Sequence, residues 1–372
     1  MILDIIAGAR PNFIKIAAVI HAINERNKKG YIIKYRLIHT GQHYDKNMSE
    51  NFFTQLNIPK PQINLNAGGG TQAEQTGAIM LGYEKLLSTT FVPNICIVVG
   101  DVTSTMACAI VAKKALCKVA HIEAGIRSND LSMPEEINRL VTDSITDYFF
   151  TTTLTASNNL NVQGVAAKNI FFVGNTMIDT LMNFRNKLSK PKFWNELKLE
   201  KKKFLLLTIH RPNNVDDKMR IKQYLQVILD NSKDYKIVFP VHPRTKQIIH
   251  TLNIESNRLF FVEPQGYLQF NYLAQHAFAV ITDSGGVTEE TTYMGVPCLT
   301  LRDNTERPET ITIGTNELIG TTPESLMPYL QKLFDGQWKK GAIPEKWDGK
   351  AGERIVSKLL EINKNEKYFS CL

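Results

Sequence analysis

The feature that most constrains this sequence is a regular alternation of short apolar segments, rich in β-branched residues, with longer segments of helical periodicity. The alternation fills the first half of the chain and starts again after residue 203. Strands that are apolar on both faces and alternate with helices indicate parallel sheets covered by helices on both sides. We therefore predict the α/β class, with two doubly wound Rossmann-like domains. The expected strands are residues 2–7, 32–38, 95–99, 118–122, 148–150 and 170–173, then 204–207, 236–241, 259–262, 279–282 and 298–301.

A basic stretch without any strand pattern separates the two series. Residues 183–203 hold eight Lys or Arg and only two Asp or Glu, so we place the domain boundary between residues 173 and 203. In open α/β sheets, ligands bind outside the carboxyl ends of the strands. We therefore expect the functional residues directly after the strands, and the site in the cleft between the two domains.

The overall charge points to an anionic partner without naming it. The chain has 44 Lys and Arg against 36 Asp and Glu, a net charge of +8. Nucleic acid, a membrane surface and a phosphorylated small molecule all fit that charge. No apolar run reaches the roughly 18 residues of a membrane span, and the N-terminus is unlike a signal peptide. The five cysteines form no CxxC pair, which favours a cytoplasmic setting, and no His or Cys spacing typical of a metal site occurs.

Three segments of the first half bring carboxylates toward one sheet edge. Asp101 follows the strand at 95–99, and Glu123 follows the strand at 118–122. Glu135, Glu136 and Arg139 open a later helix. Taken alone, Asp101 is explained equally well as a helix cap, and acids in a first helical turn are common partners of the helix dipole. Together, several carboxylates beside an arginine indicate general acid–base chemistry.

Other segments have the character of anion sites. Arg10 and Lys15 follow the first strand in a Gly-Ala-Arg-Pro-Asn turn, where free N–H groups at a helix start would favour a phosphate. A solvated basic helix start is the alternative interpretation. In the second half, His210 and His242 each end a strand beside an arginine. The sharpest signal is the Ser-Gly-Gly turn at 284–286, which leads from a strand into a helix and favours negative charge.

Taken in order, these segments resemble the non-hydrolysing UDP-N-acetylglucosamine 2-epimerase family. The resemblance runs from residue 8 to residue 316, which is nearly the whole chain. The matching stretches are GARPNFIKIAAVI, TGQHYD, VVGDVTSTMA, HIEAGIRSNDLSMPEEINR, VGNTMIDTL, TIHRPNNVDD, FPVHPRT, TDSGGVTEE and RDNTERPETITIGTN. The combination of HIEAG with PEE-NR, TDSGG with EE, and RD-TERPE is highly specific.

The resemblance implies a glycosyltransferase-B fold in which the second domain binds most of UDP and the last helix returns to the first domain. The implied domains are residues 1–173 with 356–372, and residues 174–355. It also implies a cytoplasmic homodimer without a cofactor, nucleic-acid partner or membrane association. The implied reaction inverts C2 of UDP-N-acetylglucosamine (UDP-GlcNAc) to give UDP-N-acetylmannosamine (UDP-ManNAc), by elimination of UDP to a 2-acetamidoglucal and re-addition.

The same resemblance implies roles for individual residues. The acid–base candidates are Asp101, Glu123 and Glu135, with Arg139 orienting them and His210, Lys15 and Arg10 assisting the leaving diphosphate. The implied UDP contacts are Gln265, Phe270, Ser284, Gly285, Gly286, Glu290 and Arg307. Gln42 and His43 lie in a region that contacts a second UDP-GlcNAc in regulated members.

Some segments depart from the commonest pattern of the family and leave alternatives open. GARPNF stands where many members have a GTRPE-like segment, and HRPNN where many have a second arginine followed by Glu-Asn. Residues 67–72 lack the basic residue that regulated members supply to the second substrate molecule. The alternatives are an epimerase for a UDP-2,3-diacetamido uronic acid, a hydrolysing epimerase, a glycosyltransferase of the same fold and, most distantly, a nucleic-acid binder.

Overall fold

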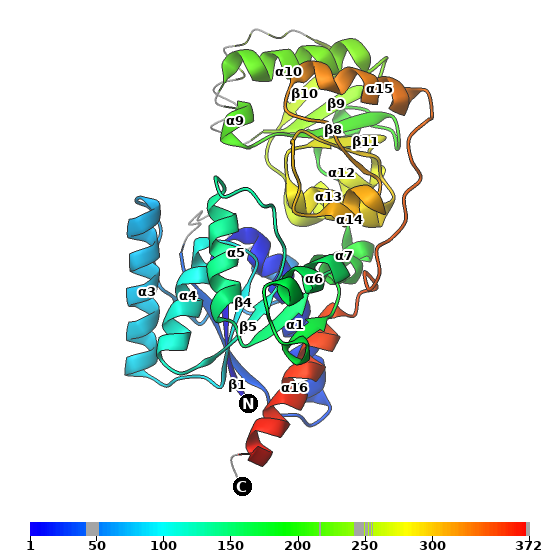
Figure 1. Cartoon of the computed structure of the whole chain (residues 1–372). Helices are drawn as coiled ribbons and strands as arrows, with labels where there is room; N and C mark the ends of the chain where they lie inside the picture. Colours follow the sequence, from blue (N-terminus) through cyan, green and yellow to red (C-terminus); the bar gives the residue numbers. More distant parts are fainter. Residues whose placement is uncertain are drawn as a thin grey trace. The chain divides into compact units, whose positions relative to one another are not determined.

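The chain forms two compact α/β units (Figure 1). The computed structural model describes residues 1–41, 52–215, 217–241 and 256–369, together with residues 249, 252 and 254. The first unit comprises Met1–Asn183 and Glu345–Leu372, and the second comprises Phe184–Pro344. Within the part of the chain that the structure describes, no helix is both long and apolar enough to cross a membrane.

The first unit is built on a seven-stranded parallel sheet in the order β3-β2-β1-β4-β5-β6-β7. Its strands are β1 (Ile2–Ala7), β2 (Lys34–His39), β3 (Ile63–Asn64), β4 (Ile95–Val99), β5 (Lys118–Ile122), β6 (Tyr148–Thr151) and β7 (Ile170–Phe172). Its helices are α1 (Arg10–Lys28), α3 (Gln72–Thr89), α4 (Thr103–Lys114), α5 (Pro134–Ile145), α6 (Leu154–Val162), η1 (Ala167–Asn169), α7 (Thr176–Phe184) and α16 (Ala351–Phe369). Helices α3, α4 and α5 pack in a row, and α1 packs against α16.

The second unit repeats this architecture with six parallel strands in the order β10-β9-β8-β11-β12-β13. Its strands are β8 (Phe204–Thr208), β9 (Lys236–Pro240), β10 (Leu259–Val262), β11 (Ala279–Thr282), β12 (Cys298–Thr300) and β13 (Asn316–Leu318). Its helices are η2 (Arg185–Lys187), α8 (Phe193–Glu196), α9 (Pro212–Val215), α10 (Lys218–Asn231), α12 (Tyr267–His276), α13 (Gly285–Met294), α14 (Pro308–Thr312), η3 (Pro323–Ser325) and α15 (Leu326–Phe334). Two apolar clusters, one with α10 and α15 and one with α12 and α13, form its core.

The predicted α/β class with two doubly wound sheets is confirmed. Two strands were not predicted, β3 and β13, because they are two and three residues long and contain no apolar run. Strand β2 begins two residues later than expected, at Lys34, because Ile32 is 75% exposed and lies outside the sheet. All four described cysteines are buried and unpaired, as expected for small core residues.

Each sheet has one point at which the order of strand addition reverses. In the first sheet β1 lies between β2 and β4, and in the second sheet β8 lies between β9 and β11. At such a point the connections leave toward opposite faces, and the carboxyl ends of the two strands are the usual place for a ligand. The residues that follow β1, β4, β8 and β11 are therefore the ones best placed for function.

Candidate active site

Helix α5 presents one polar face to the carboxyl edge of the first sheet. Glu136, Arg139 and Asp143 are three and four residues apart, so they share a face of the helix, and all three are buried. Arg139 donates through Nη1 to Glu136 Oε2 at 3.0 Å and through Nη2 to the Asp101 carboxylate. Asn138 donates from Nδ2 to the Asp101 backbone carbonyl at 2.8 Å. One helix therefore fixes both the backbone and the side chain of Asp101.

The two neighbouring acids of α5 do different things. Glu136 accepts from Ser128 N–H at 2.9 Å and from Asn129 N–H at 3.1 Å, so it holds the turn that precedes the helix. Glu135 is partly exposed in the first turn of α5. The side chain of Asp101 is 24% exposed. Asp101 and Glu135 are thus accessible to a ligand, whereas Glu136 has a structural role.

Glu123 directly follows β5, and its backbone has a conformation that residues other than glycine rarely adopt. Its φ of 69° lies in the left-handed region, which costs a non-glycine residue about 1 kcal/mol or more. Its N–H donates to the Phe150 carbonyl at 2.9 Å, and its carboxylate pairs with the buried ammonium of Lys15 on α1. Gly100 also has a φ of 69°, and a Cβ there would lie 3.3 Å from both Glu123 Oε2 and Lys15 Nζ. The glycine therefore leaves room for a buried ion pair beside Asp101.

The turn after β1 is closed by the side chain of Asn12. The backbone amides of Gly8 and Ala9 donate to Asn12 Oδ1 at 3.2 and 2.9 Å, and Asn12 Nδ2 donates to the Val99 carbonyl at 3.2 Å. These two N–H groups are therefore already bound by the Asn12 side chain, and the phosphate site expected beside Arg10 and Lys15 stays a prediction. Asn12 instead ties the end of β1 to the end of β4. Arg10 is partly buried, and its guanidinium lies 5.3 Å from the centre of the Phe52 ring.

In the second unit, His210 is anchored by a buried aspartate, Asp283, which is not among the predicted site residues. Asp283, at the end of β11, is 2.9 Å from His210 Nδ1, and it accepts from Arg211 N–H at 2.9 Å and Asn214 Nδ2 at 3.0 Å. Burial raises the pKa of Asp283, but the contacts with His210, Asn214 and Arg211 outweigh it and hold the pKa below its ordinary value. The His210 side chain is 58% exposed. Asp283 thus fixes Nδ1, and the rest of the ring faces outward.

The predicted Ser-Gly-Gly turn forms the start of α13. Ser284 is the N-terminal capping residue, and Gly285 and Gly286 open the helix, where the first N–H groups have no intrahelical acceptor. Arg302 pairs with Glu306 at 2.8 Å. Both side chains come within 3.9 Å of the place where a Cβ of Gly285 would lie. A helix N-terminus of small residues with a guanidinium nearby is suited to an anion.

The remaining residues of the predicted nucleotide site divide into partly exposed and buried ones. Glu290 accepts from Asn271 Nδ2 at 3.2 Å and joins α13 to α12. Arg307 is buried, with Nε 3.1 Å from Glu289 Oε1, so it braces α13. Gln265 is partly exposed and donates from Nε2 to the Glu263 carbonyl at 2.6 Å. Phe270 packs, half-buried, against the α12–α13 core cluster. Gln42, His43, His242 and Arg244 lie outside the described residues.

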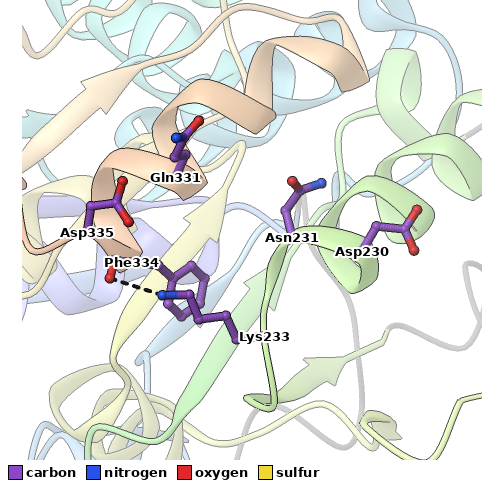
Figure 2. Close-up of a pocket in the computed structure, with 6 residues that line it drawn as sticks. All are labelled: Asp230, Asn231, Lys233, Gln331, Phe334 and Asp335. Carbon is purple, nitrogen blue, oxygen red and sulfur yellow. Dashed lines mark hydrogen bonds between the residues drawn. The ribbon is translucent and has the colours of Figure 1, made fainter.

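Two further features of the described residues concern metal binding and pockets. Among the described residues, no group of three or more His, Cys, Asp or Glu is arranged to hold a metal ion. A hollow of about 270 Å³ lies between the C-terminal ends of α10 and α15, at the amino edge of the second sheet (Figure 2). Its lining residues are Asp230, Asn231, Lys233, Gln331, Phe334 and Asp335, and Lys233 Nζ donates to the Phe334 carbonyl at 3.3 Å.

Comparisons with known proteins agree with one another. A family profile described as UDP-N-acetylglucosamine 2-epimerase matches residues 24–360. A Methanocaldococcus jannaschii protein of that name is 42% identical over 369 residues, which cover 96% of this chain and 98% of the relative. A Pseudomonas aeruginosa UDP-2,3-diacetamido-2,3-dideoxy-D-glucuronate 2-epimerase is 38% identical over 367 residues, with 96% and 99% covered. The crystal structure of the M. jannaschii enzyme in complex with UDP-GlcNAc and UDP has a TM-score of 0.85 at 41% identity, covering 97% and 100%.

Proposed function

The chain belongs to the UDP-N-acetylglucosamine 2-epimerase family, and from that premise we propose that it converts UDP-GlcNAc to UDP-ManNAc by inverting C2. One observation carries the proposal: Asp101, Glu123 and Lys15 meet around Gly100, directly after β4 and beside β1. Proton transfer at a sugar carbon needs fixed carboxylates, and this is the reversal point of the first sheet, where an α/β fold binds its ligand.

The proposed reaction begins with elimination. A carboxylate takes the C2 proton, the C2–H electron pair becomes the C1=C2 bond of a 2-acetamidoglucal, and the C1–O electron pair leaves with UDP. UDP then adds back to C1, and C2 receives a proton on the opposite face. Asp101, Glu123 and Glu135 are the proposed acid–base groups, because the reaction needs proton donors and acceptors on both faces of the ring.

The charges around these carboxylates support that assignment. Lys15 neutralises Glu123 and Arg139 neutralises Asp101, and the two cations come from different helices, α1 and α5. Each carboxylate is therefore held in one orientation by a partner that the fold itself positions. We assign Arg139 the orienting role and Lys15 a second role beside the departing diphosphate, with Arg10 nearby.

The second unit supplies the proposed nucleotide contacts. Developing negative charge on the leaving diphosphate is stabilised by the α13 N-terminus at Ser284–Gly286 and by His210, whose ring Asp283 anchors at Nδ1. Glu290 and Gln265 are the proposed contacts of the ribose and the uracil, with Phe270 beside the base. The buried Arg307 acts through Glu289 and α13 in this scheme.

The test is exchange at C2. The protein is incubated with UDP-GlcNAc in deuterated water, and the sugar is followed by proton NMR. UDP-ManNAc carrying deuterium at C2 supports the proposal, whereas free N-acetylmannosamine with UDP indicates hydrolysis instead of re-addition. Transfer of the N-acetylglucosamine to an acceptor sugar, with release of UDP and no C2 exchange, would identify a glycosyltransferase.

A second substrate is favoured by a specific observation. The P. aeruginosa relative named for a UDP-2,3-diacetamido glucuronate covers 96% of this chain at 38% identity, close to the 42% of the M. jannaschii enzyme. The same exchange assay is therefore run with both sugars in parallel. A kcat/KM at least tenfold higher for the diacetamido uronate would transfer the proposal to that substrate while leaving the C2 chemistry unchanged. A homodimer, proposed from the family resemblance, is tested by sedimentation of the same sample.

A further inference from the structure

A third ionic group lies beneath the proposed acid–base residues, and no step of the reaction uses it. His121 is the fourth residue of β5, Arg127 follows the turn after Glu123, and Asp143 is on α5. Their side chains are 0%, 5% and 2% exposed. The proposed reaction assigns none of these three side chains a contact with the substrate, so any effect on catalysis is exerted through their neighbours.

The hydrogen bonds of His121 determine where its protons are. Nε2 is 2.8 Å from the Gly100 carbonyl oxygen, and Nδ1 is 2.7 Å from Asp143 Oδ1. A carbonyl oxygen only accepts, so Nε2 carries a proton. The other oxygen of Asp143 accepts from Gly125 N–H at 3.0 Å and pairs with Arg127 Nη2 at 2.7 Å, as expected for an ionised carboxylate. Nδ1 therefore carries a proton as well, which makes the ring an imidazolium.

The state of Asp143 agrees with that geometry. Burial raises the pKa of Asp143, but its contacts with His121 and Arg127 outweigh the effect and hold the pKa below its ordinary value. Asp143 therefore has two close partners, His121 through Oδ1 and Arg127 through Oδ2, each at 2.7 Å.

The pair contacts both turns that carry the proposed acid–base groups. His121 binds the carbonyl of Gly100, the residue before Asp101. Asp143 binds the N–H of Gly125, two residues after Glu123, which is held at a φ of 69°. Asp143 lies one helical turn beyond Arg139, which binds the Asp101 side chain.

We propose that His121 and Asp143 are positioning residues that hold the Asp101 turn and the strained Glu123 turn at a fixed spacing. The proposal rests on the proposed C2 chemistry. Without the pair, the two turns separate by a small distance while the binding groups of the second unit are unchanged. Misplacement of reacting groups by about 1 Å costs on the order of 100-fold in rate.

The first test measures the protons directly and does not depend on activity. The eight histidines are labelled with ¹⁵N, and the ring signals are recorded at pH 7. His121, identified by the loss of its signals in His121→Gln, is expected to show two N–H protons, one bound to the Gly100 carbonyl and one to Asp143. A single ring proton at pH 7 overturns the imidazolium, whatever the enzyme's substrate is.

The second test compares two buried aspartates of the first unit, Asp143 on α5 and Asp4 in β1. Asp143→Asn is expected to lower kcat for C2 exchange by about 100-fold with a change in KM of less than threefold. Asp4→Asn is the matched control, because Asp4 is fully buried in β1 and pairs with Arg36 through both oxygens, at 2.6 and 2.7 Å. It is expected to lose stability but to retain kcat in the folded fraction.

The kcat values of the variants distinguish a positioning role of His121 and Asp143 from a purely structural one. If Asp143→Asn and Asp4→Asn have the same kcat, the pair serves stability alone and the positioning role is wrong. His121→Gln provides a second variant, since its amide reaches the Gly100 carbonyl but carries no charge. It should share the loss of kcat. If the wild-type protein exchanges no C2 proton while His121 keeps both ring protons, the proposed function fails and the protonation state stands.

Discussion

The two sheet edges use opposite means to place charge next to a ligand. At the reversal point of the first sheet, buried carboxylates are locked by cations from α1 and α5, and one of them sits on a strained backbone. At the reversal point of the second sheet, the groups are backbone amides of a Gly-Gly helix start and one exposed imidazole. The first arrangement suits proton transfer, which requires fixed geometry, and the second suits an anion that binds, leaves and returns.

The largest effect on the rate of C2 exchange is expected when Glu123, at the carboxyl edge of the first sheet, loses its carboxylate. Glu123→Gln should lower C2 exchange by about 1,000-fold, since a general base contributes on that order, while the Kd for UDP changes less than threefold. Exchange is followed by NMR and UDP binding by calorimetry. Glu361→Gln, an exposed site on α16, is the control for the same change of charge. Loss of UDP binding in Glu123→Gln would contradict the division of labour between the two units.

The second prediction concerns the second sheet and distinguishes Asp283, which anchors the turn, from His210, the proposed ligand contact. Asp283→Asn should lower the free energy of unfolding by about 3 kcal/mol, because three N–H donors lose a buried anionic acceptor. His210→Gln leaves those backbone contacts in place and should cost less than about 1 kcal/mol. Both variants should weaken UDP binding about tenfold. Urea unfolding and calorimetry measure the two quantities. Equal destabilisation by both variants would show that the contact between His210 Nδ1 and Asp283, and not the N–H contacts, stabilises this turn.

A third prediction concerns a buried carboxylate that belongs to neither edge. Asp179 on α7 accepts from Gly352 N–H at 2.8 Å at the start of α16. Burial raises the pKa of Asp179 to about 6, more than its hydrogen bonds to Gly352 and Ala351 lower it. Because the pKa is raised in the folded state, protonated Asp179 stabilises the fold. This contribution to the free energy of unfolding is fully present below the unfolded pKa of 3.8 and is lost as the pH rises through about 6.

Asp179→Asn should therefore stabilise the protein at pH 8 by about 2 kcal/mol and have little effect at pH 4.5. Asp143 and Asp283 have lowered pKa values, so their contribution has the opposite sign. It is present above pH 3.8 and lost as the pH falls through their folded values. Urea unfolding of wild type and variant at the two pH values measures the difference. A gain that is the same at both would rule out titration of Asp179 as its cause.

The sequence predicts a strand of this protein well only where the apolar run is long enough to form a recognisable pattern. Strand β4 is a continuous apolar run of five residues, and β5 is a five-residue strand whose last four residues are buried. Both strands and the acidic residues that follow them, Asp101 and Glu123, could therefore be placed. Strands β3 and β13 are too short to carry a pattern. The alternation of apolar segments with helical segments predicted the two-domain α/β architecture. The order of the matching motifs along the chain pointed to the family.

Contacts made across the chain were not predictable in the same way. The Asn12 bonds that close the first turn depend on side-chain geometry, and nothing in the local pattern marks them. Asp283, which anchors His210, does have a local signal, because it lies between the end of β11 and the Ser-Gly-Gly turn. The left-handed Glu123 has none, because glutamate has no preference for positive φ. These are sites where function, and not local propensity, selects the residue.

The smallest effects are predicted for replacing one glycine in each unit by alanine. The comparison distinguishes backbone strain from steric crowding of the added Cβ. Gly100 and Gly295 have φ values of 69° and 67°, but only Gly100 has neighbours that a Cβ would approach, at 3.3 Å from Glu123 Oε2 and Lys15 Nζ. Gly295→Ala should cost about 1 kcal/mol of backbone strain alone and leave kcat unchanged. Gly100→Ala should cost about 2 kcal/mol and lower kcat about tenfold, because the buried pair must shift. If both variants lose stability equally and both keep kcat, the first edge tolerates movement, and its fixed geometry would no longer distinguish it from the second.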